Sequence, residues 1–397
     1  MVLVLLARNP TDSVTFGLLP AAHRAGLPVR VLTDDPAAHR AVYAAAGFAW
    51  PTVEGCAVTD ARAVLAAIGE RPTAVLSNSD HLQVQTALAA DYFELPGKDW
   101  RAAVRARDKG LMRVRLREQG LDDTPFVRLR PGDPIDGVAC PGVLKPAEGV
   151  ASEDVVLVHD RADLEQRITA IRTRRDGDLL VEGLLEGPLH TLETLGDGER
   201  LRVWGGWRTT VSAAPYFIEE RLTWEPDRPA EVLTAVLAQL AALGVGFGPT
   251  HTEFVVTADG PRIVEVNDRL IGDHCDFAMA ELLAEPVFDD VLAVHLGEPP
   301  RPAPPEPPPT HGLVHWVLAT TDGVLVEAPP AGRRRVRTEA GAMVHLDYRP
   351  IRAIGRNAKV TGTNRDYLGS VQAIGPDQAS AAAAVEQFCR GERWVIE

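Results

Sequence analysis

The sequence predicts an α/β protein with a Rossmann-like N-terminal region, because apolar runs and helical patterns alternate through its first hundred residues. Runs typical of buried strands lie at Val2–Ala7, Val29–Thr33 and Ala74–Ser77. Helices are expected at 12–25, 37–46, 60–68 and 81–90. Alternation of this kind favours a parallel sheet with crossover helices. The first strand-to-helix turn, ARNPTDS, lacks the G-x-G-x-x-G pattern, so dinucleotide binding is not expected.

A chain of 397 residues is too long for one ordinary core, so two or three domains are expected. We place an N-terminal domain at 1–97, a central domain at 98–298 and a small, mostly-β C-terminal module at 311–397. The stretch 299–310 is predicted to be a stiff linker, because its successive prolines lack N–H donors and favour polyproline II. A long basic helix is expected over Trp100–Gln119. Further strands and helices are predicted at 138–145, 155–159, 163–174, 179–182, 190–195, 230–243, 251–257, 261–267 and 381–388.

The bulk composition excludes several classes of partner. A formal net charge of −14 argues against nucleic acid, since phosphate backbones reward excess Lys and Arg. No apolar run reaches the roughly 20 residues that a membrane helix requires, so no membrane partner is expected. The four cysteines form no C-x-x-C pair and suit a reducing compartment. A cytoplasmic location is therefore the expectation.

The segment TEFVVTADGPRIVEVND contains the residues most suited to chemistry. In an antiparallel pair centred on the turn 258–260, Glu253 and Glu265 lie opposite each other, and Asn267 shares their face. Two facing carboxylates repel unless a cation lies between them, and an oxygen-only cluster suits Mg²⁺ or Mn²⁺. Arg269 follows in the same register, where it would meet developing negative charge. An exposed hairpin with scattered charges would give the same pattern.

This segment resembles the metal-binding signature of the ATP-grasp ligases, in which Glu is followed twelve positions later (265 − 253 = 12) by Glu-x-Asn-x-Arg. Three further segments occur in the order that this superfamily has, namely ARDKGLMR, GVLKPAEG and LLVEGLLEGPLH. The resemblance implies the ATP-grasp fold, with a mobile lid at about 120–185 and with ATP and Mg²⁺ as cofactors. It assigns ATP binding to Lys109, Lys145, Ser152, Glu182, Gly183, Leu185 and His190, and metal binding to Glu253, Glu265 and Asn267.

Each ATP-binding assignment has a simpler alternative. Lys109 would otherwise be a solvated helix lysine, which is the usual fate of lysine. Glu182 would otherwise be an exposed strand end, and His190 a structural or surface histidine. Lys145 is harder to explain in this way, because it ends an apolar strand and precedes a proline and a loop.

A narrower resemblance concerns the substrates. WRTTVSAAPYFIEE and GPTHTEF are similar to segments of the L-amino acid ligases, which are carboxylate–amine ligases. The resemblance implies that Glu219 or Glu220 binds a substrate ammonium. It places Thr210 and Tyr216 on the acceptor side and Trp207 in the wall of a substrate pocket, and it implies that His251 faces the acyl group. The alternative is an irregular strand pair with ordinary packing aromatics.

Two segments depart from the superfamily pattern. The loop after Lys145 is usually rich in glycine and serine, but here it reads AEGVASED. Either its acids, Glu148, Glu153 and Asp154, point outward, or phosphate closure differs. In IGDHCDF, after Arg269, Asp273 and His274 either reflect an unusual substrate or cap the next helix.

The resemblance implies a carboxylate–amine ligase that forms an amide bond through an acyl phosphate, with Arg269, Glu265 and Asn267 as catalytic residues. Its partners would be small-molecule carboxylates and amines, in the biosynthesis of small molecules or natural products. Amino acids, short peptides and polycarboxylates all stay open as substrates. Two alternatives also stay open, a biotin carboxylase-type enzyme that activates bicarbonate and a non-catalytic nucleotide-binding protein. Homodimers are common in the superfamily, although the sequence itself does not fix the oligomeric state.

Overall fold

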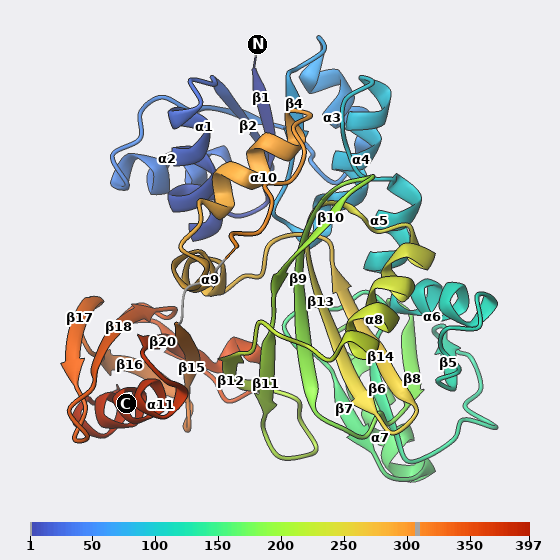
Figure 1. The fold of residues 1–397 in the computed structure, drawn as a ribbon. Helices are drawn as coiled ribbons and strands as arrows, with labels where there is room; N and C mark the ends of the chain where they lie inside the picture. Colours follow the sequence, from blue (N-terminus) through green and yellow to red (C-terminus); the bar gives the residue numbers. More distant parts are fainter. Residues whose placement is uncertain (1, 306–309) are drawn as a thin grey trace.

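The computed structural model describes residues 2–305 and 310–397. Figure 1 shows an N-terminal part (blue) above a central part (cyan to yellow), with a C-terminal module (red) at the lower left. Parallel strands, antiparallel strands and helices are all present, which confirms the α/β class predicted from the sequence. Residues 306–309, which belong to the predicted proline-rich linker, lie outside the described residues.

Four parallel strands form the N-terminal sheet, in the order β3-β2-β1-β4. Their bounds are β1 Leu3–Leu6, β2 Val29–Thr33, β3 Thr52–Gly55 and β4 Ala74–Leu76. The helices are η1 Ser13–Leu18, α1 Leu19–Arg24, α2 Pro36–Ala45, α3 Ala61–Ile68, η2 Asp80–Leu82 and α4 Gln83–Tyr92. The Rossmann-like arrangement is confirmed. Strand β3 was not predicted, because Val53 is the only large apolar residue in it.

The single long helix predicted over Trp100–Gln119 is wrong. Two helices occupy this segment, α5 Trp100–Arg107 and α6 Lys109–Glu118. Asp108 between them is extended, with φ −102° and ψ 105°, and its side chain caps α6. The same carboxylate receives two hydrogen bonds from Arg128, at 3.2 and 2.6 Å. The break places Lys109 in the first turn of α6, close to the hairpin described below.

An antiparallel sheet of four strands, in the order β5-β8-β6-β7, occupies the predicted lid region. Its elements are β5 Phe126–Leu129, β6 Gly142–Pro146, β7 Val156–Val158, β8 Leu179–Gly183 and the covering helix α7 Arg161–Arg172. Apolar side chains from these strands and from α7 form a core cluster of their own. The sheet lies at the lower right of Figure 1, behind the lower end of the central strands in this view.

The largest sheet has the order β14-β13-β9-β11-β12-β15-β20-β18-β17, with β10 paired to β9. Its central strands are β9 Leu189–Asp197, β10 Leu201–Gly205, β11 Trp207–Val211, β12 Glu219–Trp224, β13 Phe247–Thr257 and β14 Gly260–Asn267. Its C-terminal strands are β15 His311–Leu318, β17 Gly332–Arg337, β18 Met343–Pro350 and β20 Tyr367–Gly375. Because β12 pairs with β15, the sheet runs from the central part into the C-terminal module.

The remaining elements cover this sheet or close the module. They are α8 Ala230–Leu243, β16 Gly323–Glu327, β19 Asn357–Ala358, η3 Asn364–Asp366, α11 Gln378–Gly391 and β21 Val395–Ile396. Helix α8 packs on α6 and β14, and α11 packs on β15, β18 and β20. The mostly-β C-terminal module with a late helix is therefore as predicted, although β15 joins it to the central sheet.

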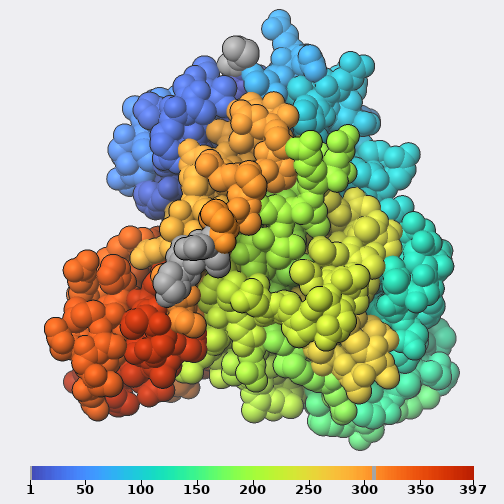
Figure 2. All heavy atoms as spheres, viewed as in Figure 1, coloured from blue at the N-terminus to red at the C-terminus, as the bar shows by residue number. Residues whose placement is uncertain are grey.

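Two helices, α9 Cys275–Leu283 and α10 Val287–His295, follow the hairpin and pack against the N-terminal part. Figure 2 shows these helices (orange) lying against the blue N-terminal atoms. The contact is close, because a Cβ on Gly17 would lie 2.3 Å from the ring of Phe288. Of the helices in the described ranges, none combines the length and the apolar character needed to cross a membrane.

The pairing of β9 with β13 predicts a sharp difference between two glycines. A Cβ at Gly196 would lie 2.0 Å from the carbonyl oxygen of Gly246, whereas a Cβ at Gly246 meets nothing within 4 Å. We expect Gly196→Ala to lower the free energy of unfolding by about 1–3 kcal/mol, because the strands must separate. Urea denaturation of Gly196→Ala and of the control Gly246→Ala checks this. Equal losses in the two variants would contradict it.

Candidate active site

The two carboxylates predicted to face each other do so. Glu253 of β13 pairs with Glu265 of β14, and the pair His251 and Asn267 lies next to them. The Asn267 amide nitrogen is 3.5 Å from a carboxylate oxygen of Glu253. The hairpin therefore brings two carboxylates and an amide to one place.

The register of the hairpin differs from the predicted one in two compensating ways. The turn is tighter than predicted, because Thr257 pairs with Gly260. Continued unchanged, this register would place Glu253 opposite Val264. A β-bulge leaves Val264 unpaired and shifts the register by one residue, so that Glu253 meets Glu265.

Each of the two carboxylates has a cation beside it. Lys109 Nζ lies 2.8 Å from Glu265 Oε1. His251 Nε2 lies 3.5 Å from Glu253 Oε1, and its Nδ1 lies 2.8 Å from Glu193 Oε1. Burial lowers the pKa of His251, but the carboxylates of Glu193 and Glu253 outweigh burial and raise this pKa to about 10. The imidazole is therefore cationic at neutral pH.

Two cavities adjoin at these carboxylates. The larger, of about 560 Å³, lies between the N-terminal loops, the hairpin, the start of α9 and the C-terminal module. The smaller, of about 190 Å³, lies between the strands β6 and β8 and the hairpin. The residues that line both cavities are Val150, Ser152, Glu219, Glu253 and Glu265. A group bound in one cavity would therefore lie next to a group bound in the other.

Most residues that the resemblance assigned to ATP line the smaller cavity. They are Lys109, Lys145, Ser152, Glu182, Gly183 and Leu185. His190 is not among the lining residues; its ring stacks on Phe254, with centroids 5.8 Å apart. Burial lowers the pKa of His190 to about 4, so this imidazole is neutral. Its ribose contact stays a prediction.

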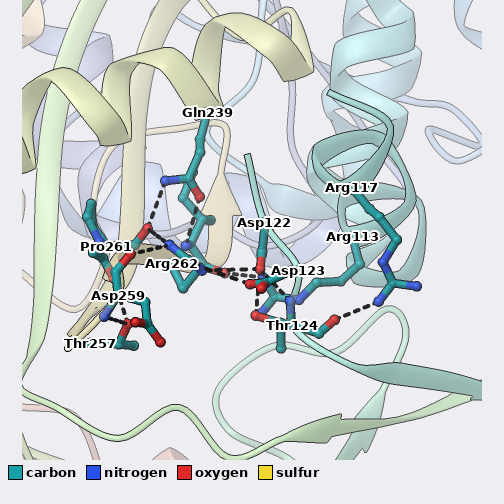
Figure 3. A network of polar contacts seen from close by, with 12 residues as sticks. Arg113, Arg117, Asp122, Asp123, Thr124, Gln239, Thr257, Asp259, Pro261 and Arg262 are labelled. Carbon is teal, nitrogen blue, oxygen red and sulfur yellow. Dashed lines mark hydrogen bonds and ion pairs between the residues drawn. The ribbon is translucent and has the colours of Figure 1, made fainter. Parts of the chain in front are cut away.

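A buried charge network supports the smaller cavity. Lys145 Nζ lies 2.5 Å from Glu182 Oε2, and Arg113 Nε lies 3.0 Å from Glu182 Oε1. Arg113 also pairs with Asp122 at 2.5 Å, and Figure 3 shows Arg113 and Arg262 converging on this carboxylate. Burial raises the pKa of Glu182, but Lys145 and Arg113 outweigh burial and lower this pKa to about 2. The sequence analysis missed Arg113, whose spacing resembled that of a surface arginine on a basic helix.

The acids of the loop after Lys145 fit the first of the two interpretations given above, because Glu148, Glu153 and Asp154 line neither cavity. Asp154 pairs with Arg174 at 2.7 Å and with Arg175 at 3.2 Å. Glu153 lies 3.6 Å from Arg175. Their negative charge is therefore compensated by arginines of the lid rather than aimed at a phosphate site.

The N-terminal part completes the larger cavity. Arg269, which lines it, is held by Asp80 through a 2.7 Å contact between Nη2 and Oδ2. Burial lowers the pKa of Arg269, but the carboxylate of Asp80 outweighs burial and raises it. Asp80 was not predicted, although it belongs to the polar run Asn78–Asp80 that directly follows β4. Polar residues at the carboxyl ends of parallel strands commonly face a binding crevice, and that signal was available.

The predicted acceptor residues fall into two groups. Glu219 and His251 line the larger cavity. Trp207 is fully buried and packs edge-on against Trp224, with ring centroids 4.9 Å apart. Thr210 and Tyr216 are exposed, and neither they nor Trp207 line the two cavities. The acceptor-side roles of these three residues have no support in the geometry.

The helix-cap interpretation of Asp273 and His274 is wrong. His274 stands at the start of α9 but makes no side-chain hydrogen bond to the helix. Its Nε2 instead lies 2.6 Å from Asp12 Oδ2, and both Asp273 and His274 line the larger cavity. Their φ values are 53° and 68°, a strained conformation of the kind that gathers at functional sites.

Comparison with solved structures shows the fold. The chain matches an L-amino acid ligase from Bacillus licheniformis with a TM-score of 0.79 and 19% identity, covering 100% of this chain and 98% of that one. It matches a phosphoribosylglycinamide synthetase from Anaerococcus prevotii with a TM-score of 0.72 and 13% identity, covering 100% and 99%. It matches a biotin carboxylase from Campylobacter jejuni with a TM-score of 0.70 and 15% identity, covering 99% and 92%. The chain has the ATP-grasp fold.

Two curated proteins are similar in sequence to this ATP-grasp chain. It is 28% identical over 322 residues to the uncharacterized protein y4rH of Sinorhizobium fredii, covering 77% of this chain and 64% of that protein. It is 26% identical over 153 residues to Dapdiamide A synthase of Enterobacter agglomerans, covering 36% of each. The chain thus spans less than two thirds of the length of either relative. No protein-family model matches the chain.

The residues of this site fit a magnesium ion. Across residues 2–305 and 310–397, no three His, Cys, Asp or Glu side chains cluster in a way that would hold a metal ion. Glu253 and Glu265 offer two carboxylates, and Asn267 adds an amide oxygen. Magnesium usually takes one or two protein carboxylates and completes its shell with water and phosphate, so this small set suffices. Burial, and then the carboxylate of Glu253, raise the pKa of Glu219 to about 8, which shows how crowded with negative charge the site is.

We expect Glu182→Gln to flatten the pH dependence of the unfolding free energy between about pH 4.5 and pH 2. The folded pKa of Glu182, about 2, lies below its ordinary value of 4.5. Ionised Glu182 therefore stabilises the fold fully above pH 4.5, and this contribution is lost as the pH falls through 2. Urea unfolding across this range compares wild type, Glu182→Gln and the exposed control Glu199→Gln. Equal slopes in all three proteins would contradict the assignment.

Proposed function

We propose that the protein is an ATP-dependent ligase that joins the carboxylate of one small molecule to the amine of another. The observation that carries this proposal is the meeting of two cavities at Glu253 and Glu265. The smaller cavity has two lysines, Lys109 and Lys145, which suit phosphate groups. The larger cavity has Arg269 and Glu219, which suit a carboxyl oxygen and an ammonium group.

In the proposed reaction a carboxylate oxygen of the substrate attacks the γ-phosphorus of ATP. The bond from this phosphorus to the bridging oxygen breaks, and ADP leaves. The nitrogen of a neutral amine then attacks the carbonyl carbon of the acyl phosphate, the carbon–oxygen bond to phosphate breaks, and the nitrogen loses a proton. The products are an amide, ADP, phosphate and a proton.

The chain's residues position and stabilise the charged groups in this reaction. Phosphate oxygens would be bound by Lys109, Lys145 and Ser152. The adenine would be bound at the end of β8 and just after it, by Glu182, Gly183 and Leu185. Glu253, Glu265 and Asn267 would hold magnesium, which when bound neutralises charge on the phosphates. Arg269, fixed by Asp80, would donate to the oxyanion of the tetrahedral intermediate.

Amino acids are the substrates that this site suits best. An L-amino acid ligase shares the fold over the full chain, and Dapdiamide A synthase is similar over about a third of the sequence. Glu219, which is half-buried and lines both cavities, offers a carboxylate to a substrate ammonium. A role in the biosynthesis of small molecules follows as part of the proposal, and so do a cytoplasmic location and a homodimeric state.

Glu265→Gln should abolish ADP formation, because it removes one of two metal-binding carboxylates and the partner of Lys109. ADP release is measured with ATP, Mg²⁺ and a panel of amino acids and hydroxy-acids, and mass spectrometry identifies the product. Asp259→Asn, in the turn of the same hairpin, is the control that keeps activity. Full ligase activity in Glu265→Gln would rule out the metal assignment.

Arg269→Ala should act on the second half of the reaction. Removal of one oxyanion donor typically lowers kcat about 10²–10³-fold, so amide formation should fall by that factor. ADP formation should fall less, because the acyl phosphate would form and then hydrolyse. The ratio of amide to ADP in single assays measures this. An unchanged ratio at reduced rate would show that Arg269 serves phosphoryl transfer instead.

Assays with different substrates distinguish the ligase from the bicarbonate-activating alternative. ATP hydrolysis that needs bicarbonate, and that free biotin increases, would favour it. ATP hydrolysis that needs an amino acid, with an amide as product, supports the ligase.

A further inference from the structure

A short turn of the C-terminal module contacts the site, although it belongs to neither of the two segments that were predicted to bind substrates. The turn is η3, Asn364–Asp366, and it directly precedes β20. Asp366 is 2% exposed, and its carboxylate accepts hydrogen bonds from the Thr361 and Gly362 amides and from the Thr361 hydroxyl. These internal bonds fix the shape of the turn, so it is able to position other segments.

The turn contacts the phosphate-facing loop 150–154. The backbone N–H of Asn364 donates to the Ala151 carbonyl oxygen at 3.1 Å. Arg365 Nε lies 2.7 Å from Glu153 Oε1. These contacts cross between the C-terminal module and the lid, which are distant in sequence.

The loop needs such contacts because its own backbone is strained. Ala151, Ser152 and Asp154 have φ values of 57°, 53° and 59°, a region that disfavours residues with a Cβ. Ser152, which lines both cavities, lies in the middle of this segment. A strained conformation persists only where surrounding structure holds it, and the turn is part of that structure.

The same turn also fixes Glu219. The Glu219 amide donates to Asn364 Oδ1 at 3.1 Å, and the Tyr367 hydroxyl donates to the Glu219 carbonyl oxygen at 2.8 Å. Tyr367 is 2% exposed and stacks face to face on Trp316, with centroids 5.1 Å apart. Both backbone polar groups of Glu219 are therefore bound by residues 364 and 367.

We infer that the segment Asn364–Tyr367 is a positioning element shared by the two halves of the site. Arg365 holds the phosphate-facing loop, Tyr367 holds the ammonium-binding Glu219, and Asn364 holds both. The inference rests on the proposed function for what the two halves bind. It assigns to the C-terminal module a direct part in aligning the phosphate group with the amine.

Three single variants separate the two arms of the positioning element. In hydrogen–deuterium exchange, Arg365→Gln should speed exchange in a peptide over 147–157 and leave 212–222 unchanged. Tyr367→Phe should show the reverse pattern, and so should Asn364→Ala, because it removes Oδ1 but keeps the backbone N–H that binds Ala151. This measurement needs no substrate, so its outcome is independent of whether the ligase proposal holds.

The same variants should differ in binding. Arg365→Gln should weaken the affinity for MgADP, measured by calorimetry, about two- to fivefold, the scale of an exposed ion pair. Tyr367→Phe should leave MgADP affinity unchanged. It should raise the KM for the L-amino acid that gives the fastest ADP release about two- to tenfold, the scale of one hydrogen bond. Arg365→Glu alone and Glu153→Arg alone should each weaken MgADP binding. The double variant, which restores the ion pair with its charges exchanged, should recover the lost affinity.

Matched controls come from the same module. Arg390→Gln removes an arginine that is 67% exposed, against 62% for Arg365, and that pairs with Glu386. Tyr348→Phe removes a buried hydroxyl that binds Trp394. Both should leave MgADP affinity unchanged. If Arg365→Gln and Tyr367→Phe alter exchange and binding no more than these controls, the inference is overturned. If the wild-type protein releases no ADP but the exchange results are as expected, the ligase proposal is wrong. The positioning role is then still supported by the exchange data.

Discussion

Compensation of buried negative charge is the constraint on which the architecture of this site depends. Glu253 and Glu265 face each other across a hairpin, and each has a cation beside it, from His251 and Lys109 respectively. A buried carboxylate without a partner costs several kcal/mol, on the order of 3–5 when one member of a pair is removed. Lys109 reaches Glu265 because the helix is interrupted at Asp108, so the path of the backbone and the charge of the hairpin depend on each other.

The same constraint joins three elements beneath the smaller cavity. Glu182 of β8 receives Lys145 of β6 and Arg113 of α6, and Arg113 also donates to the carbonyl oxygen of Ile263 in β14 at 2.7 Å. A guanidinium that is 1% exposed thus ties the strand β8 to the hairpin that bears Glu253 and Glu265. The planar fork of arginine suits this task, because it presents several donors in fixed directions. The two cavities keep their relative position through charge pairs as well as through apolar packing.

Local patterns in the sequence predicted many of the helices and strands. They did not predict contacts between segments that are distant in the sequence. The helix α8 and the facing pair Glu253 and Glu265 followed from apolar periodicity and from a turn signal, and so did the strands β1, β2, β4, β6, β7, β8, β9, β13 and β14. The pair was right although the turn is shorter than predicted, because the bulge at Val264 compensates. Trp207 was misplaced because aromatic residues at alternate strand positions serve a core as readily as a pocket. Asp80 had a signal in its position after a parallel strand, whereas Asn364 was out of reach, since only the folded chain brings it to the larger cavity.

The acidic loop after Lys145 has an unfavourable backbone conformation that contacts from other elements restrain. The loop after Lys145 places Ala151, Ser152 and Asp154 in backbone conformations that glycine adopts freely. Ion pairs from Arg174 and Arg175, just after α7, and from Arg365 of the C-terminal turn supply the restraint. They lie near the surface, where salt screens charges within about 8–10 Å at moderate ionic strength. The conformation of this loop is therefore tied to charges on two other elements. Because the turn that holds the loop also binds Glu219, a change in the loop's restraint bears on both cavities at once.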